Sequence, residues 1–170
     1  MATRILSGWR IAKALGIKSA DIRDDLPIQI VSTGVPFIFV PIRTLDALAK
    51  CAPNAPALAA LFKPREQILP IYMFVANESG EFAPRSRMFA PFTGVSEDPA
   101  TGSASAPFGA YATTYGLINP APKASFVIQQ GVEMGRPSEI HVEVARKDSG
   151  AFAIRIGGRC AIVGEGSMFL

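Results

Sequence analysis

The sequence of 170 residues suits one domain with a sizeable core, and its 49% hydrophobic and 18% charged residues exclude a disordered chain. Its apolar residues never form the run of about 20 that a membrane-spanning helix needs, and its first ten residues lack a secretory cleavage pattern. The net charge is +3 and the pI is 9.1, but the lysines and arginines are scattered, so neither nucleic acid nor a membrane is an expected partner. We therefore expect a soluble cytoplasmic protein.

Residue types that bind metals are sparse in this chain. The two cysteines, Cys51 and Cys160, belong to no CxxC pair, so they are expected as packed, reduced thiols. The single histidine, His141, lies in an alternating run and is expected on the polar face of a strand. No metal site is therefore expected.

Apolar and alternating runs predict a series of short strands in chain order. The predicted strands cover residues 28–32, 37–42, 68–76, 87–90, 125–130, 140–146 and 152–156. Two glycines at 157 and 158 predict a hairpin that leads into a further strand at 160–163. Two short helices are predicted at 45–50 and 57–62, in a region punctuated by prolines.

A segment without charges follows in the second half of the chain. Residues 99–122 contain no Asp, Glu, Lys, Arg or His, and their middle part, 103–115, combines small residues with three aromatic ones. A helix with no charged face is usually buried. Because many short strands surround this segment in the sequence, we expect an α+β domain in which a mixed, barrel-like sheet wraps round a central apolar helix.

The start of this helix is the candidate site. Residues 97–104 read EDPATGSA, so a proline turn and a small, hydroxyl-rich loop lead directly into the helix. The first N–H groups of a helix have no partners within it, and the helix dipole makes that end positive, which favours a bound carboxylate or phosphate. The alternative is that Thr101 or Ser103 only caps the helix, with Asp98 adding a favourable charge.

Four motifs in this sequence resemble those of the PhzF-like proteins of phenazine biosynthesis. The first is RMFAP at 87–91, followed by Gly94 and by EDPATGSA at 97–104, which is the most specific part. The others are QQGVEMGRPS at 129–138, two glycines at 157–158 followed by VGEG at 163–166, and VSTG at 31–34 followed by residues 37–41. The resemblance covers nearly the whole chain from about residue 14.

This resemblance implies a diaminopimelate epimerase-like fold. In that fold two similar domains each wrap a sheet round a central helix, and the active site lies in the cleft between them. Residues 14–170 would form a single C-terminal domain preceded by an N-terminal segment, 1–13. The N-terminal catalytic domain of the family would be absent from this chain.

The resemblance also assigns roles to the EDPATGSA motif. Asp98 would be catalytic, and Thr101, Gly102, Ser103 and Ala104 would bind a substrate carboxylate. Related epimerases have a cysteine where this chain has Ala104, so a two-thiol mechanism is excluded on this side. The implied reaction is a proton transfer that needs no cofactor and uses a carboxylate, with Asp98 either transferring protons or orienting the substrate.

Half of the expected active site has no counterpart in the sequence. The principal catalytic glutamate of the family belongs to its N-terminal domain, and Glu97, the alternative acid or base, corresponds to the residue beside Asp98 in the motif. We therefore expect an isomerase subunit that binds a small carboxylate and is completed by a separate N-terminal-half chain or by homo-oligomerisation. The alternatives are a non-catalytic carboxylate-binding or protein-interaction domain, and a truncated fragment of a longer isomerase.

Overall fold

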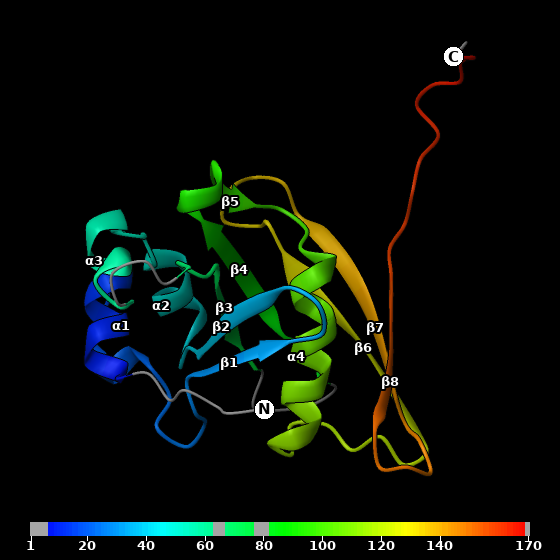
Figure 1. Cartoon of the computed structure of the whole chain (residues 1–170), viewed down its shortest axis with the longest axis horizontal. Coiled ribbons are helices and arrows are strands. Elements are labelled where there is room, and N and C mark those ends of the chain that lie inside the picture. The colour runs from blue at the N-terminus through cyan, green and yellow to red at the C-terminus, as the bar shows by residue number, and fades with distance from the viewer. Residues whose placement is uncertain (1–6, 63–66, 77–81, 169–170) are drawn as a thin grey trace.

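The computed structural model describes residues 7–62, 67–76 and 82–168 (Figure 1). The first half contains α1 (Gly8–Leu15), η1 (Ser19–Asp21), β1 (Gln29–Ser32), β2 (Pro36–Pro41), α2 (Leu45–Lys50), α3 (Ala55–Ala59) and β3 (Ile71–Val75). The second half contains β4 (Arg85–Ala90), η2 (Pro91–Thr93), β5 (Val95–Asp98), α4 (Gly102–Thr114), β6 (Lys123–Gln130), β7 (Ser138–Arg146) and β8 (Phe152–Gly157).

The strands form one mixed sheet that curls round helix α4 (Figure 1). Its order is β1-β2-β3-β4-β6-β7-β8, and β5 pairs with β4 beside this path. The β2–β3 and β4–β6 pairs are parallel, whereas the other pairs are antiparallel. The predicted α+β architecture, a mixed, barrel-like sheet round a central apolar helix, is therefore confirmed.

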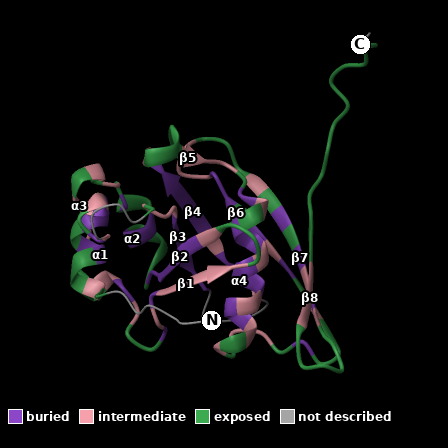
Figure 2. Cartoon of the chain, viewed as in Figure 1, coloured by how far each residue is buried: buried purple, intermediate pink, exposed green. Residues whose placement is uncertain are grey.

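Helix α4 is buried by aromatic side chains from the surrounding sheet and from the segment just before β4 (Figure 2). The ring of Phe108 is fully buried, and five other aromatic rings have centroids 4.8 to 6.3 Å from its own. These rings belong to Phe39, Tyr72, Phe74, Phe82 and Phe126. Because aromatic groups bury large apolar areas, this cluster anchors the helix inside the sheet and fixes where its N-terminus points.

A second core lies on the opposite face of the sheet, under α1, α2 and α3. Helix α1 contributes Ile11 and Leu15, both fully buried, and Gly16 ends it in the left-handed conformation at φ 70°. Helix α1 was not among the predicted elements, and it crosses the boundary that the sequence suggested between residues 13 and 14. The buried Cys51 also belongs to this core, and burial raises the pKa of its thiol to about 12.

The predicted strands agree with the structure except at the C-terminal end. Neither Gly157 nor Gly158 has the positive φ that tight two-residue hairpin turns require, and residues 158–168 form no strand. This segment leaves the sheet as an exposed chain (Figures 1 and 2), with Ile162 96% and Val163 98% exposed. The predicted hairpin into 160–163 is therefore wrong, and Cys160 is exposed rather than packed.

Two further details differ from the sequence prediction. The predicted helix at 57–62 begins two residues earlier, as α3, because the side chain of Asn54 accepts a hydrogen bond from the amide of Ala57 and caps it there. Strand β5 was not predicted. Among the described residues, no helix is both long and apolar enough to cross a membrane.

Candidate functional site

The candidate site is the turn that joins strand β5 to helix α4. Asp98 is the last residue of β5 and is half-buried, and Thr101 is the N-cap residue of α4. The Thr101 hydroxyl donates a hydrogen bond to Oδ2 of Asp98 over 2.7 Å. Oδ1 of Asp98 has no hydrogen-bond or ion-pair partner within the described part of the chain.

The first turn of α4 offers two free donors. Thr101 occupies the N-cap position, but its side chain makes no capping hydrogen bond to the helix. The amides of Ala104 and Ser105 both donate to the Thr101 carbonyl over 3.1 Å. Those of Gly102 and Ser103 find no acceptor among residues 7–62, 67–76 and 82–168. The predicted anion-binding donors therefore reduce to two amides and the exposed hydroxyl of Ser103.

A buried glutamine holds this turn from behind. Gln130, at the end of β6, is completely buried, and its side-chain oxygen accepts the amide of Thr101 over 3.2 Å. Its nitrogen Nε2 donates to the Asp98 carbonyl over 2.7 Å and to the Thr101 hydroxyl oxygen over 2.8 Å. Gln130 was not among the predicted site residues, although it is a polar residue that ends an apolar strand pattern.

The next residue, Gly131, brings its loop against the same turn. Gly131 has φ 77°, and a Cβ added there would lie 2.3 Å from the Arg136 carbonyl oxygen and 2.9 Å from that of Pro99. Such distances exclude any larger side chain without displacement of the backbone. The loop after β6 is thus seated directly on the proline that follows Asp98.

Glu97 lies beside Asp98, but its carboxylate forms an ion pair with an arginine. The guanidinium of Arg87 donates to both carboxylate oxygens of Glu97, over 2.8 and 2.9 Å. The same guanidinium donates to three carbonyls at the end of α2, those of Leu48, Ala49 and Cys51. Burial opposes the charge of Arg87, but the hydrogen bonds and charge of Glu97 outweigh it and raise the pKa of the guanidinium. Glu97 therefore acts as the structural counter-ion of Arg87.

A pocket of about 880 Å³ opens beside the start of α4. Its lining residues come from the turn, the start of β4, the β6–β7 hairpin, the end of β8 and the residues just after β8; they include Ala100, Gly102, Ile140, Ile156, Arg85 and Arg159. One of its two arginines, Arg85, is paired with Glu133 over 3.2 Å. Of the two residues with free amides, Gly102 lines this pocket, so a small organic anion could fit there with its charged group near the Gly102 amide.

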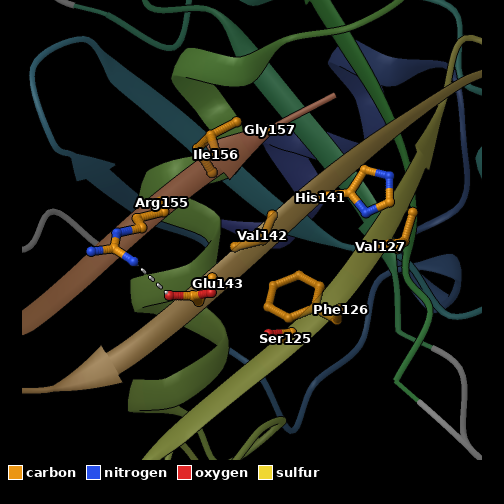
Figure 3. Close-up of a pocket in the computed structure, with 9 residues that line it drawn as sticks. All are labelled: Ser125, Phe126, Val127, His141, Val142, Glu143, Arg155, Ile156 and Gly157. Carbon is orange, nitrogen blue, oxygen red and sulfur yellow. Dashed lines mark hydrogen bonds and ion pairs between the residues drawn. The ribbon is translucent and has the colours of Figure 1, made fainter. Parts of the chain in front are cut away.

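A smaller pocket of about 430 Å³ lies on the face of strands β6, β7 and β8 turned away from α4 (Figure 3). His141 is exposed there, as predicted for the polar face of a strand. Glu143 is paired with Arg155 over 3.3 Å and with Lys123 over 2.5 Å, and the Lys123 hydrogen bond lowers the pKa of its carboxyl. Because these charges neutralise one another on an exposed surface, the pocket of about 880 Å³ beside the start of α4 is the better candidate for a substrate site.

No group of three or more His, Cys, Asp or Glu side chains placed to hold a metal ion occurs among the described residues. The candidate site therefore consists of one carboxylate, two free amides and a hydroxyl.

Comparison with known proteins decides the family. Residues 2–166 match the family described as "Phenazine biosynthesis-like protein", PhzC-PhzF. The chain belongs to this family.

Curated relatives of the phenazine biosynthesis-like family share about a third of their residues with this chain. An uncharacterised isomerase of Clostridium acetobutylicum is 34% identical over 165 residues, which cover 95% of this chain and 54% of that protein. The trans-2,3-dihydro-3-hydroxyanthranilate isomerase of Pseudomonas fluorescens is 32% identical over 160 residues, covering 94% of this chain and 52% of its own length. The chain thus spans about half the length of the curated relatives it matches.

Solved structures of the same family share the fold. The crystal structure of the Bacillus anthracis phenazine biosynthesis protein of the PhzF family matches with a TM-score of 0.79 at 24% identity. The match covers 92% of this chain and 54% of the other. At this identity the likeness concerns the fold, which is diaminopimelate epimerase-like, as the sequence motifs implied.

The residues of the EDPATGSA motif differ in burial and in whether their amides are hydrogen-bonded within the protein. The structure brings Asp98, Thr101, Gly102, Ser103 and Ala104 into one turn, as the sequence implied. Within that turn, Thr101 and Ala104 are buried and their amides are engaged inside the protein, whereas those of Gly102 and Ser103 are free among the described residues.

Proposed function

We propose that this chain supplies the substrate-binding face of a PhzF-like isomerase and binds the carboxylate of a small substrate at the start of α4. The observation that supports this most directly is the pair of free amides at Gly102 and Ser103, beside the pocket of about 880 Å³. A carboxylate there would accept two N–H hydrogen bonds and lie at the positive end of a 13-residue helix. The Ser103 hydroxyl supplies a third donor.

Asp98 is the proposed proton-transfer group. Its Oδ1 is free among the described residues, and Asp98 belongs to the same turn as Ala100 and Gly102, which line the pocket, although Asp98 itself does not. In the proposed reaction a substrate C–H bond breaks and Asp98 accepts the proton, the double bonds of the substrate shift, and Asp98 or the second acid donates a proton to form a new C–H bond elsewhere on the same molecule. No atoms are gained or lost and no cofactor is required. Ala104 provides no thiol for the alternative epimerase chemistry.

The second acid or base would come from outside the described residues. Glu97 is fully engaged by Arg87, so it is a poor candidate for that role. The curated relatives are about twice as long as this chain, which supports our proposal that residues 14–170 are one domain of a two-domain site. The other half would be a separate chain, a second copy or, if the sequence is a fragment of a longer isomerase, another part of the same protein.

Two substitutions at Gly102 test the carboxylate site. Proline is tolerated at the first position of a helix but removes the N–H, whereas alanine keeps the N–H and adds the same Cβ, 3.6 Å from Ile156. We expect Gly102→Pro to weaken binding of benzoate and 2-aminobenzoate by roughly 1.5–3 kcal/mol, the value of a hydrogen bond to a charged group. Gly102→Ala should bind nearly as the parent does, and neutral benzamide should bind to neither protein.

The measurement is isothermal titration supported by thermal shift, followed by an exchange assay. The assay would incubate trans-2,3-dihydro-3-hydroxyanthranilate in D₂O with the chain purified from its own source, whose assembly is first recorded by native mass spectrometry. Carboxylate binding with deuterium uptake that Asp98→Asn abolishes would support the isomerase. Binding without exchange in any assembly would favour a carboxylate-binding domain, and equal binding of benzoate and benzamide would exclude the site.

A further inference from the structure

The hydrogen bonds of Gln130 fix the orientation of its amide group. The Thr101 amide can only donate, so the atom facing it must be the oxygen Oε1; the Asp98 carbonyl can only accept, so the atom facing it must be Nε2. If the amide were flipped, its N–H would face the N–H of Thr101 and its oxygen would face the carbonyl oxygen of Asp98. Gln130 is completely buried, where such mismatches are costly, so a single orientation is possible.

This orientation also places the proton of the Thr101 hydroxyl. The second N–H of Nε2 donates to Oγ1 of Thr101 over 2.8 Å, so Oγ1 is an acceptor on that side. Its own single proton is then free to point at Oδ2 of Asp98, 2.7 Å away. The donors run in one direction, from Gln130 to Thr101 to Asp98.

The chain of donors makes the two oxygens of Asp98 unequal. Oδ2 is held by the hydroxyl of Thr101, a residue that is only 4% exposed, whereas Oδ1 meets no partner among the described residues. We propose that Gln130 and Thr101 are positioning residues that hold Oδ2 and present Oδ1 as the proton-accepting atom towards the bound carboxylate substrate. This inference rests on the proposed function, since it concerns the same site.

The surroundings of the network support a positioning role. Gln130 also ties the backbone of Asp98 to the end of β6, and Gly131 seats the following loop on Pro99. The turn is therefore fixed at its carbonyl, its amide and its side chain by a single glutamine. A carboxylate held in this way needs little reorganisation before proton transfer, and a misplacement of about 1 Å can cost on the order of 10²-fold in rate.

Nuclear magnetic resonance of the ligand-free chain tests the direction of the hydrogen bonds. In an equal mixture of H₂O and D₂O, a slowly exchanging hydroxyl gives two resolved ¹³Cβ lines for its threonine, one for each isotope. We expect two lines for Thr101 in the parent and a single averaged line in Asp98→Ala, where the acceptor is missing. A single line in the folded parent would overturn the proposal, whatever the activity of the protein.

The exchange assay with trans-2,3-dihydro-3-hydroxyanthranilate tests the consequence for catalysis. Thr101→Val removes the donor while keeping the shape, and we expect kcat to fall about 10- to 100-fold with KM changed by less than about twofold. Thr101→Ser restores the hydroxyl and should recover kcat to within about threefold. Gln130→Met should resemble Thr101→Val, because it removes both Nε2 donors.

Ser105→Ala is the matched control for these variants. The Ser105 hydroxyl is as deeply buried and donates to the Thr101 carbonyl over 2.9 Å, but it does not contact Asp98. If Ser105→Ala lowers kcat as much as Thr101→Val, or if Thr101→Val raises KM alone, the positioning role is wrong. A parent with no exchange activity but with two Thr101 lines would refute the proposed reaction and leave the hydrogen-bond direction established.

Discussion

At the scale of single residues, adjacent acidic side chains in one motif have different physical environments. Glu97 is held by two hydrogen bonds from a buried guanidinium, whereas Asp98 receives one from a hydroxyl and keeps an oxygen free among the described residues. The sequence placed both acids at the start of a buried helix but could not distinguish them by their surroundings. Arg87 and Gln130, which create the difference, lie 10 and 32 positions from Glu97 and Asp98, respectively.

Partners so far apart in the sequence meet only through strand pairing. Gln130 reaches the Asp98 turn because β6 pairs in parallel with β4, which puts Gln130 opposite Ser86. The only sequence sign of such a role was a polar residue at the end of a buried strand. Local patterns identify the helix start and its free amides, but the residues that orient Asp98 follow from the topology of the sheet.

The Arg87–Glu97 pair should be important for stability as well as for the site. Arg87→Ala would leave the half-buried Glu97 carboxylate without its counter-ion and three carbonyls at the end of α2 without their donor. Breaking one side of a buried pair typically costs about 3–5 kcal/mol of unfolding free energy. Because the pair keeps some exposure, we expect the lower part of this range, measured by urea unfolding.

Arg155→Ala is the control for this substitution. Arg155 pairs with Glu143 on the outer face of the sheet, where its side chain is 83% exposed, so its loss should cost less than about 1 kcal/mol. Similar losses for Arg87→Ala and Arg155→Ala would contradict a structural role for the buried guanidinium.

At the scale of elements, the periodic patterns predicted most strands and the buried helix, and the exceptions have physical reasons. Helix α1 was not predicted, although Ile11, Ala12 and Leu15 lie on one face and Gly16 ends it, which is a readable helical pattern. Strand β5 has no apolar alternation, and Glu97 on it is held by Arg87 on the neighbouring β4. Its existence depends on a tertiary contact that local sequence does not encode.

The packing of α4 on β7 makes a sharp prediction at the element scale. A Cβ at Gly109 would lie 3.0 Å from Val144 and 3.3 Å from Val142, so the helix backbone lies directly on the sheet. Gly109→Leu should force the two apart and lower the unfolding free energy by roughly 1–3 kcal/mol or more. Ala110→Leu, at the next and only partly buried position, should cost clearly less in the same thermal or urea unfolding experiment.

At the scale of the whole molecule, the sheet separates two cores of different character. One face packs on aliphatic side chains from α1, α2 and α3, and the other packs on the aromatic cluster round α4. The candidate site lies where α4 emerges from this second core, so the aromatic cluster supports the position of the amides. The barrel-like arrangement could be predicted from the segment without charges and from the many short strands. The core under α1, α2 and α3 could not, because only α2 of these three helices was predicted with its observed bounds.

The exposed C-terminal segment should contribute little to the stability of the fold. Residues 160–168 form no strand, and Ile162, Val163 and Met168 are each at least 87% exposed. A stop codon after Arg159 should therefore leave the thermal midpoint within about 2 °C of the parent, since exposed positions change stability by only about 0.5 kcal/mol. If residues 160–163 instead formed the hairpin strand that the glycines suggested, truncation would expose the apolar side of β8 and lower the midpoint by many degrees. Differential scanning calorimetry of the full and shortened chains at equal concentration distinguishes the two, and repeating it across a tenfold concentration range separates loss of folding from loss of association.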